Sequence, residues 1–162
     1  MPKRTPVGEA GTAVILLTFR ANGLLVAAGD RLSADEDLTS ARWQVLGAIA
    51  LADRPLTVPQ IARRMGLTRQ SVHVTVRRLI HDGLLEMTPN VDHRRSQLVC
   101  LTERGRAAYA AMDVRQATWV NRIADGIGRA ELNTTARVLD ELCRRLEADR
   151  REETQAEEGG ET

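Results

Sequence analysis

Apolar residues recur in steps of three and four along two stretches near the ends of the chain, 12–28 and 132–146. This spacing predicts two helices, each with a continuous apolar seam along one side. Residues 39–52 and 102–125 also follow a helical period. The seams consist of Val14, Leu17, Ala21, Leu24 and Ala28 in the first helix and of Leu132, Ala136, Leu139, Cys143 and Leu146 in the last, where Leu142 widens the seam.

The centre of the chain begins with a short helix whose two ends are marked by the sequence. Thr57 can cap free N–H groups, and Gln60, three residues later, completes the pattern of a capping box. Gly66 favours the left-handed backbone conformation that ends a helix. We therefore expect a sharp turn after this helix, with Leu67 filling the space before the next one.

A second helix and a β-hairpin follow directly. Thr68 is placed to cap a helix that reaches about Asp82, where Gly83 ends it. Residues 84–88 and 96–101 have the composition of strands, with turn residues between them. The core-facing positions expected in the helix are Val72, Val76, Leu79 and Ile80.

The remaining residues of the second helix carry hydrogen-bond donors. Arg69, His73 and Arg77 recur at every fourth position and therefore share one face, a pattern suited to base edges and phosphates. A basic helix face alone is more often a solvated surface. The hairpin favours nucleic acid, because its arginine-rich tip at 92–95 suits a minor groove. The candidate DNA-binding residues are Arg69, Gln70, Ser71, His73, Thr75, Arg77 and Arg78 in the helix, with Arg94 and Arg95 in the hairpin.

Five stretches together carry a more specific signal. They are Leu38-Thr39 through Trp43-Gln44-Val45-Leu46, Leu67-Thr68-Arg69 through Leu79, Gly83-Leu84-Leu85-Glu86, Asp92-His93-Arg94-Arg95 and Leu101-Thr102-Glu103-Arg104-Gly105. In this combination the chain resembles the MarR (multiple antibiotic resistance) family of dimeric winged helix-turn-helix transcription factors. The resemblance implies that the helix from Arg69 enters the major groove and that Arg95, beside Arg94, enters the minor groove. The family often has Asp immediately before these arginines, whereas this chain has His93 there and Asp92 one place earlier.

We therefore expect a mainly α fold with a small β-wing, in the α+β class: a winged helix-turn-helix flanked by N- and C-terminal dimerisation helices. The expected parts are a flexible arm at 1–11, an N-terminal dimerisation helix at 12–30, the DNA-binding domain at 38–101, C-terminal dimerisation helices at 102–149 and an acidic disordered tail at 150–162.

Dimerisation is expected because the terminal seams offer more apolar surface than one small winged helix can cover. The first and last helices of one chain would then pack against those of a second chain, as the family resemblance also implies. Packing of these helices within one chain is the alternative. A two-fold dimer places its recognition helices about one DNA turn apart, roughly 34 Å, and predicts an inverted-repeat operator.

Charge is distributed unevenly although the net charge is only +1. Residues 57–106 hold nine Arg against four acids, whereas residues 147–162 hold seven acids against two Arg. The basic centre fits a DNA-binding domain. The preference for Arg over Lys suits guanine and phosphate recognition, but a coding bias that also enriches Ala explains it equally well.

Several classes of function find no support in the sequence. We find no nucleophile elbow, phosphate-binding loop or metal-ligand spacing, so we expect neither an enzyme, a cofactor nor a metal site. Cys100 and Cys143 form no C-x-x-C pair and suggest small buried residues in a reducing cytoplasm. The first apolar run is interrupted by Arg20 and Asn22, so we expect no export signal, and we expect the stretch to be too short and too polar to span a membrane.

A small aromatic effector is a further expectation from the family resemblance, since many members bind aromatic or phenolic anions that loosen DNA binding. On physical grounds Trp43 is suited to stack on a ring, with Arg20 or Arg42 pairing its charge. A core tryptophan and surface arginines are the plainer interpretation. For the whole chain, the alternative to a DNA-binding repressor is a winged-helix module that binds a protein partner.

Overall fold

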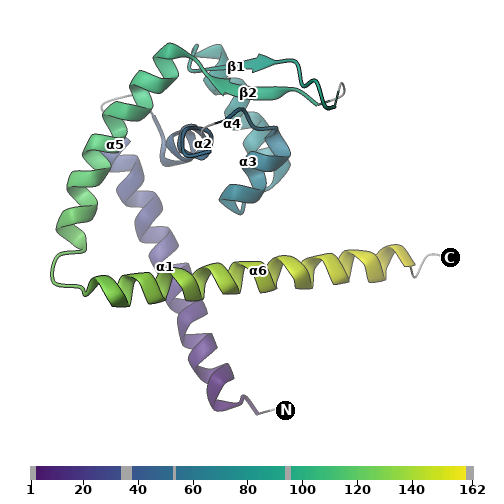
Figure 1. Cartoon of the computed structure of the whole chain (residues 1–162). Coiled ribbons are helices and arrows are strands. Elements are labelled where there is room, and N and C mark those ends of the chain that lie inside the picture. Colours follow the sequence, from purple (N-terminus) through teal and green to yellow (C-terminus); the bar gives the residue numbers. More distant parts are fainter. Residues whose placement is uncertain (1–2, 34–37, 53, 94–95, 160–162) are drawn as a thin grey trace. The chain divides into compact units, whose positions relative to one another are not determined.

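The computed structural model describes residues 3–33, 38–52, 54–93 and 96–159 of the chain. Within them the chain forms six α-helices and one two-stranded antiparallel sheet (Figure 1). It divides into two compact units, residues 1–119 and 120–162. The α+β fold with a winged helix-turn-helix, expected from the sequence, is confirmed.

The first helix, α1 (Pro6–Ser33), begins six residues before the expected position. Thr5 accepts a hydrogen bond from the Gly8 N–H at 3.1 Å, and Pro6 occupies the first turn, where its missing N–H costs little. The arm expected at 1–11 is therefore helical from residue 6 onward. Its cap-and-proline start is a signal that the apolar pattern did not include.

Helix α2 (Ser40–Ala50) is capped by Thr39 and packs against the end of α1. The contact is close at Gly29, where a Cβ atom would meet the Ser40 hydroxyl oxygen at 2.5 Å. Asp30 Oδ1 accepts a hydrogen bond from the Ser40 N–H at 2.7 Å. This junction fixes the end of α1 against α2.

Helices α3 (Val58–Met65) and α4 (Arg69–His81) form the helix-turn-helix, with the boundaries that the cap residues predict. The capping box of Thr57 and Gln60 is present, and Gly66 ends α3 with a φ of 62°. Gly83 follows α4 with a φ of 71°. Leu67 in the turn is 39% exposed, so it fills the space between the helices less completely than we expected.

Strands β1 (Leu85–Thr88) and β2 (Leu98–Leu101) form the wing, and Leu85 pairs with Leu101 at its base. Leu56, before α3, makes an isolated antiparallel bridge to Val99 through two backbone hydrogen bonds of 2.7 and 3.2 Å. Because this bridge joins the wing to the start of the helix-turn-helix, these two elements are held in one framework.

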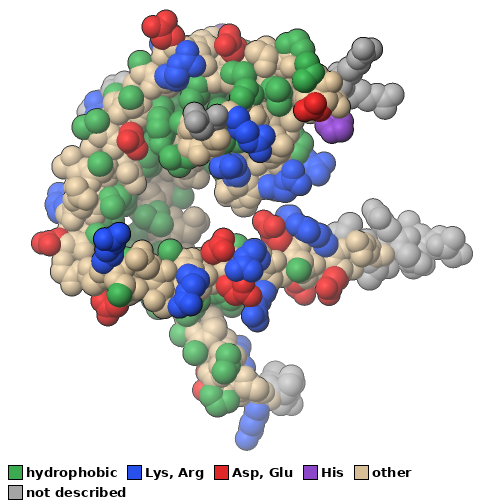
Figure 2. Space-filling model, in the orientation of Figure 1, with side chains coloured by type: hydrophobic (Ala, Val, Ile, Leu, Met, Phe, Trp, Pro, Cys, Tyr) green, Lys and Arg blue, Asp and Glu red, His purple; other side chains and the backbone are tan. Residues whose placement is uncertain are grey.

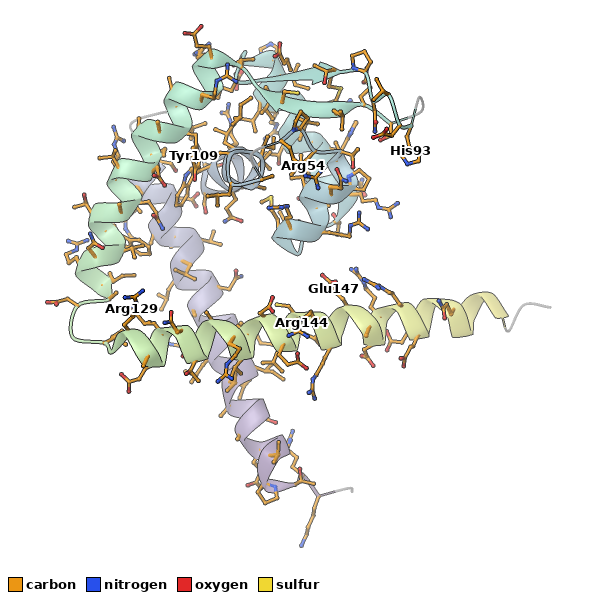
Figure 3. All side chains as sticks on the ribbon, viewed as in Figure 1. Arg54, His93, Tyr109, Arg129, Arg144 and Glu147 are labelled. Carbon is orange, nitrogen blue, oxygen red and sulfur yellow. The ribbon has the colours of Figure 1, made fainter. Side chains whose placement is uncertain are left out.

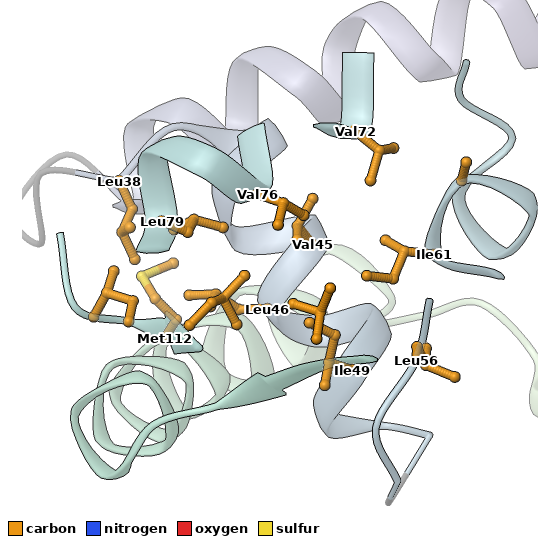
Figure 4. Close-up of a cluster of buried hydrophobic side chains, with 14 residues drawn as sticks. Leu38, Val45, Leu46, Ile49, Leu56, Ile61, Val72, Val76, Leu79 and Met112 are labelled. Carbon is orange, nitrogen blue, oxygen red and sulfur yellow. The ribbon is translucent and has the colours of Figure 1, made fainter. Parts of the chain in front are cut away.

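One buried cluster holds this part of the chain together (Figure 4). Its members come from α2, α3, α4, the wing and the helix that follows the wing, α5 (Glu103–Ile123). The fully buried side chains include Leu46, Ile61, Val76 and Met112. All the core positions expected in α4 are buried or half-buried: Val72, Val76, Leu79 and Ile80.

The start of α5 is held against the turn between α4 and β1. Thr102 donates its hydroxyl proton to the Gly83 carbonyl at 2.7 Å, and Arg104 Nη1 donates to the Asp82 carbonyl at 2.8 Å. A Cβ atom on Gly105 would collide with the Leu84 carbonyl oxygen, so glycine allows this close approach. The end of α4 is thus tied directly to the start of α5.

The apolar seam of α1 is largely exposed in the single chain. Leu17 and Leu24 are 62% and 63% exposed, whereas Ala28, beside α2, is buried. By length and composition α1 is also long and apolar enough to cross a membrane, which corrects our expectation that this stretch is too short and too polar. One such helix near the N-terminus is weak evidence for a membrane span, because core helices of soluble proteins and signal sequences have the same length and composition.

The last helix, α6 (Arg129–Gly159), begins after Gly126, whose φ is 79°. It includes residues 150–159, so the disordered tail expected from 150 is wrong for this segment. Acid–arginine pairs four residues apart favour the helix: Glu141 with Arg145 at 2.7 Å and Glu147 with Arg151 at 3.6 Å. Arg, Glu, Gln and Ala, which are frequent here, are also good helix formers.

Candidate nucleic-acid interface

The candidate interface is built on α4, whose buried side fixes the direction of its exposed side. Val72, Val76 and Leu79 are fully buried against α2 and α3. The opposite side therefore faces solvent, and most of the polar residues expected there are exposed. They are Arg69, Gln70, Ser71, His73, Arg77 and Arg78.

Thr75 differs from these residues. It is half-buried, and its hydroxyl donates to the Ser71 carbonyl at 3.2 Å within the helix. Val74, next to it, is 40% exposed and adds an apolar group among the donors. A valine at this place suits contact with a thymine methyl group better than a hydrogen bond.

Two further arginines were missed in the sequence. Arg63 and Arg64 lie exposed in the last turn of α3, next to the helix-turn-helix turn. The first helix of such a motif crosses the DNA backbone, so these two charges are candidate phosphate contacts. The helical period of α3 could have indicated them, because Ile61 and Ala62 take the buried side. Basic side chains gather over this part of the molecule below the wing (Figure 2).

The wing tip presents polar residues beyond the two strands. His93 lies exposed near the tip (Figure 3), as does Asp92. The Asp92 N–H donates to Asn90 Oδ1 at 3.1 Å, a local turn that shapes the tip, and Asn90 is buried. Arg94 and Arg95, the arginines predicted to enter the minor groove, lie outside the described residues.

A charged cluster holds the end of α4 against α2. Arg42 of α2 forms an ion pair with the Asp82 carboxylate, and His81 Nδ1 lies 3.0 Å from the other carboxylate oxygen. The hydrogen bond with His81, followed by the charge of Arg42, holds the pKa of Asp82 below its ordinary value of 3.8. Asp82 is therefore ionised at neutral pH, where it can hold Arg42.

The three residues suggested for effector binding do not lie together. Arg20 is exposed in the middle of α1. Arg42 lines a hollow with the end of α4 and the start of α5, whereas Trp43 lines a separate hollow with α3 and a later part of α5. Adjacent residues on a helix point in different directions, which explains why Arg42 and Trp43 separate.

The hollow beside Trp43 has a volume of about 560 Å³. Tyr109 of α5 lines it and contacts α2 near Gly47 (Figure 3). Burial raises the pKa of Tyr109, and the nearby Asp113 carboxylate raises it further, so the phenol stays protonated at neutral pH. Trp43 Nε1 is buried and has no hydrogen-bond partner among the described residues. The hollow thus has two aromatic side chains in its lining, Trp43 and Tyr109.

Groups of His, Cys, Asp or Glu that could hold a metal ion were not found in the part of the chain that the structure describes. Cys100 in β2 is half-buried and its sulfur lies 3.4 Å from the Thr88 hydroxyl oxygen. Cys143 on α6 is exposed in the single chain, which differs from the buried position we expected.

Comparison with known proteins gives a consistent result. A sequence model of the MarR family matches residues 36–96. The uncharacterized protein Rv2011c of Mycobacterium tuberculosis is 42% identical over 132 residues, which cover 82% of this chain and 91% of that protein. The transcriptional activatory protein BadR of Rhodopseudomonas palustris is 28% identical over 109 residues, covering 64% of this chain and 61% of BadR.

Solved structures agree on the fold. The crystal structure of NadR in complex with 4-hydroxyphenylacetate superimposes with a TM-score of 0.72 at 19% sequence identity, covering 88% of this chain and 98% of NadR. The likeness extends beyond the winged helix, since the coverage includes most of the chain on either side of it.

Proposed function

The chain belongs to the MarR family of transcriptional regulators, and from this premise we propose that it is a homodimeric, cytoplasmic repressor that binds an inverted-repeat operator. The observation that carries the proposal is the exposed polar side of α4. Arg69, Gln70, His73 and Arg77 all face solvent there, while the opposite side of the same helix is fully buried. A rigidly held helix with free donors on one side is suited to reading base edges in a major groove.

The roles we assign follow the chemistry of each group. Arg69 and Gln70 lie in the first turn of α4 and are assigned to base edges, since recognition helices commonly contact bases through their N-terminal residues. Arg77, Arg78, Arg63 and Arg64 are assigned to phosphates. Arg95, with Arg94 beside it, is assigned to the minor groove on the strength of the sequence match.

The dimer is proposed from the exposed seam of α1. Its leucines would be costly to leave in water, since burial of a leucine contributes about 1.5–3 kcal/mol. A second copy presents the same seam, so the α1 seams of the two copies can bury each other. This is the usual arrangement in a two-fold symmetric dimer. Two copies then present two recognition helices to adjacent turns of DNA, roughly 34 Å apart.

A small aromatic anion is proposed as the effector, bound in the hollow beside Trp43. Trp43 and Tyr109 supply aromatic surfaces, Trp43 Nε1 supplies a donor, and Arg64 supplies a positive charge. NadR, crystallised with 4-hydroxyphenylacetate, gives a precedent for an aromatic acid on this fold. Such a ligand changes DNA binding only through a difference in its affinity for the two dimer shapes.

Repression is proposed because a dimer seated on a promoter blocks the polymerase. BadR is named as an activatory protein, so the direction of control needs its own test. A reporter gene behind the upstream intergenic DNA should become more active when this protein is removed. Lower activity on removal would instead make the protein an activator.

A protein-interaction module is the alternative function. Such a surface usually places apolar and aromatic groups at its centre. Apart from Val74, the exposed side of α4 is polar and basic. This composition favours DNA.

The test of the proposed function is binding of the purified protein to its own upstream intergenic DNA, against a scrambled duplex of equal length. We expect sequence-selective binding by two protomers per site, with an affinity that falls steeply as salt rises, since arginine contacts release counterions. Weak binding that ignores sequence on all upstream fragments, together with recovery of a protein partner on the exposed side of α4, would favour the interaction module.

A further inference from the structure

Val74 occupies the middle of the outward side of α4. Val72 and Val76, two positions before and after it, are fully buried. Successive residues of an α-helix are turned by about 100°, so Val74 points almost directly away from that buried side. Val74 itself is 40% exposed. The part of the helix that faces solvent most directly therefore carries an apolar group.

The neighbours of Val74 on the helix surface are polar. Gln70 lies four residues before it, and Arg77 and Arg78 lie three and four residues after it; all three are exposed. Residues at these spacings are neighbours on an α-helix. Toward the end of α4, Val74 also borders a hollow of about 500 Å³ that both arginines line. Val74 is thus an isolated apolar side chain surrounded by hydrogen-bond donors.

A valine at this position is not explained by the helix or by the core. Valine has a lower helix propensity than alanine, because its branched side chain loses freedom against the preceding turn. Among the described residues, the core cluster and the side chains packed against it do not include Val74. The stiffness of the side chain holds its two methyl groups in a nearly fixed direction, which suits a contact of defined shape.

The major groove offers one apolar group that fits this arrangement. Base edges there present donors, acceptors and the 5-methyl group of thymine. A donor or acceptor placed against a valine would lose its hydrogen bond to water, which is costly. A protein partner with a broad apolar centre would cover the donors around Val74 in the same way. A thymine methyl, with polar base edges and phosphates beside it, matches both the valine and its neighbours.

We propose that Val74 contacts the 5-methyl group of a thymine in each half-site of the operator and determines specificity at that base pair. The inference rests on the proposed function, since it requires α4 to lie in the major groove. Gln70 lies about 6 Å before Val74 along the helix axis. Base pairs are about 3.4 Å apart, so the thymine should lie within about two base pairs of the base that Gln70 contacts.

The test replaces each thymine of a bound operator in turn by deoxyuridine, which lacks only the 5-methyl group and keeps every hydrogen-bonding group. Fluorescence anisotropy gives the affinity of the wild-type protein and of Val74→Ala for each duplex. Val138→Ala is the matched control, because Val138 of α6 is a valine of similar exposure, 42%. The quantity compared is the ratio of the affinities for the thymine and uracil operators. A change in folding or dimerisation leaves this ratio unaltered, because it acts on both duplexes equally.

We expect one deoxyuridine position to weaken binding of the wild-type protein about fourfold for each half-site, the value for burial of roughly one methyl group. Val74→Ala should bind the thymine and uracil operators equally well. Val138→Ala should keep the wild-type ratio.

Two results would overturn the inference and leave the proposed function intact. One is a wild-type protein that binds its operator but responds to deoxyuridine at no position. The other is an unchanged ratio in Val74→Ala, which would mean that another group contacts the methyl. Selective binding to no duplex at all would overturn the proposed function and this inference together.

Discussion

Leu46 of α2 is fully buried, whereas Leu24 of α1 is 63% exposed, although both lie at helically spaced apolar positions. The difference lies in what surrounds each helix. Helix α2 contacts α1, α3, α4 and β2, so its apolar residues are covered by its own chain. Among the described residues of α1, the fully buried ones, Ala28, Gly29 and Ser33, lie at its end.

The comparison shows that an apolar seam has different meanings in the two regions. In the winged helix the apolar sides of the helices pack against one another and form one core. In α1 most of the seam is exposed among the described residues, which is the pattern of an element that packs on a partner. The proposed DNA contacts and dimer contacts are thus separated along the sequence, and we expect that they can be altered independently.

The largest effect is expected from a change at the buried residue of this pair, Leu46. Leu46→Ala should lower the free energy of unfolding by about 2–5 kcal/mol, because it leaves a cavity in a filled core. Urea unfolding at fixed protein concentration measures this change. Val91→Ala is the control, since Val91 is 92% exposed and the change should stay within about 0.5 kcal/mol. Similar losses for both variants would contradict the core assignment.

Leu24→Ala tests whether the exposed seam of α1 is a dimer interface. If a partner helix covers Leu24, its truncation should weaken the dimer by at least about tenfold, because each protomer loses buried apolar surface. Analytical ultracentrifugation over a dilution series gives the dissociation constant. Leu16→Ala is the matched control, equally exposed at 63% on the same helix but outside the seam. Equal effects, or none in either variant, would argue against the seam as the interface.

Arg69→Ala tests a proposed DNA contact at a residue that belongs neither to the core nor to the proposed dimer interface. The change should cost about 1–3 kcal/mol of operator affinity and relax the preference at one base pair, with the dimer and its unfolding unchanged. Fluorescence anisotropy with single-base operator variants measures both effects. An exposed arginine of α6, Arg137, serves as the control. A uniform loss on every sequence would make Arg69 a phosphate contact instead.

The smallest effect is expected at Asp82, which joins α2 to the end of α4. Its pKa is lowered in the folded state by His81 and Arg42, so its ionised form stabilises the fold above the ordinary pKa of 3.8. That contribution disappears as the pH falls through the lower folded pKa. Asp82→Asn should therefore flatten this acidic part of the stability curve, as followed by urea unfolding at a series of pH values. An unchanged curve would mean that the pair does not act in solution.

Local signals in the sequence determined much of the fold. Thr57, Gly66 and Gly83 define the helix-turn-helix because caps and left-handed glycines act within a few residues. The exposed donors of α4 were also predictable, since the buried valines on the opposite side fix the direction of the helix. The extent of the terminal helices was not predicted, because the Thr5-Pro6 start of α1 and the ion pairs of α6 lie outside the apolar pattern.

The hollows could not be predicted, because they depend on which residues of distant elements meet. Arg42 and Trp43 are neighbours in sequence but line different hollows. The partners of Arg42 come from the end of α4, forty residues later. Arg63 and Arg64, by contrast, could have been predicted, because Ile61 and Ala62 take the buried side of α3 and leave the two arginines exposed.

The most direct test of the central claim is selection of bound sequences by the purified protein from a pool of random DNA duplexes, which requires no assumption about the operator's position. The account predicts enrichment of an inverted repeat whose half-site centres lie about one helical turn, roughly 10 base pairs, apart. Arg69→Ala should lose the preference at one position of each half-site. A wild-type protein that enriches no sequence would contradict the assignment of α4 as a helix that reads DNA.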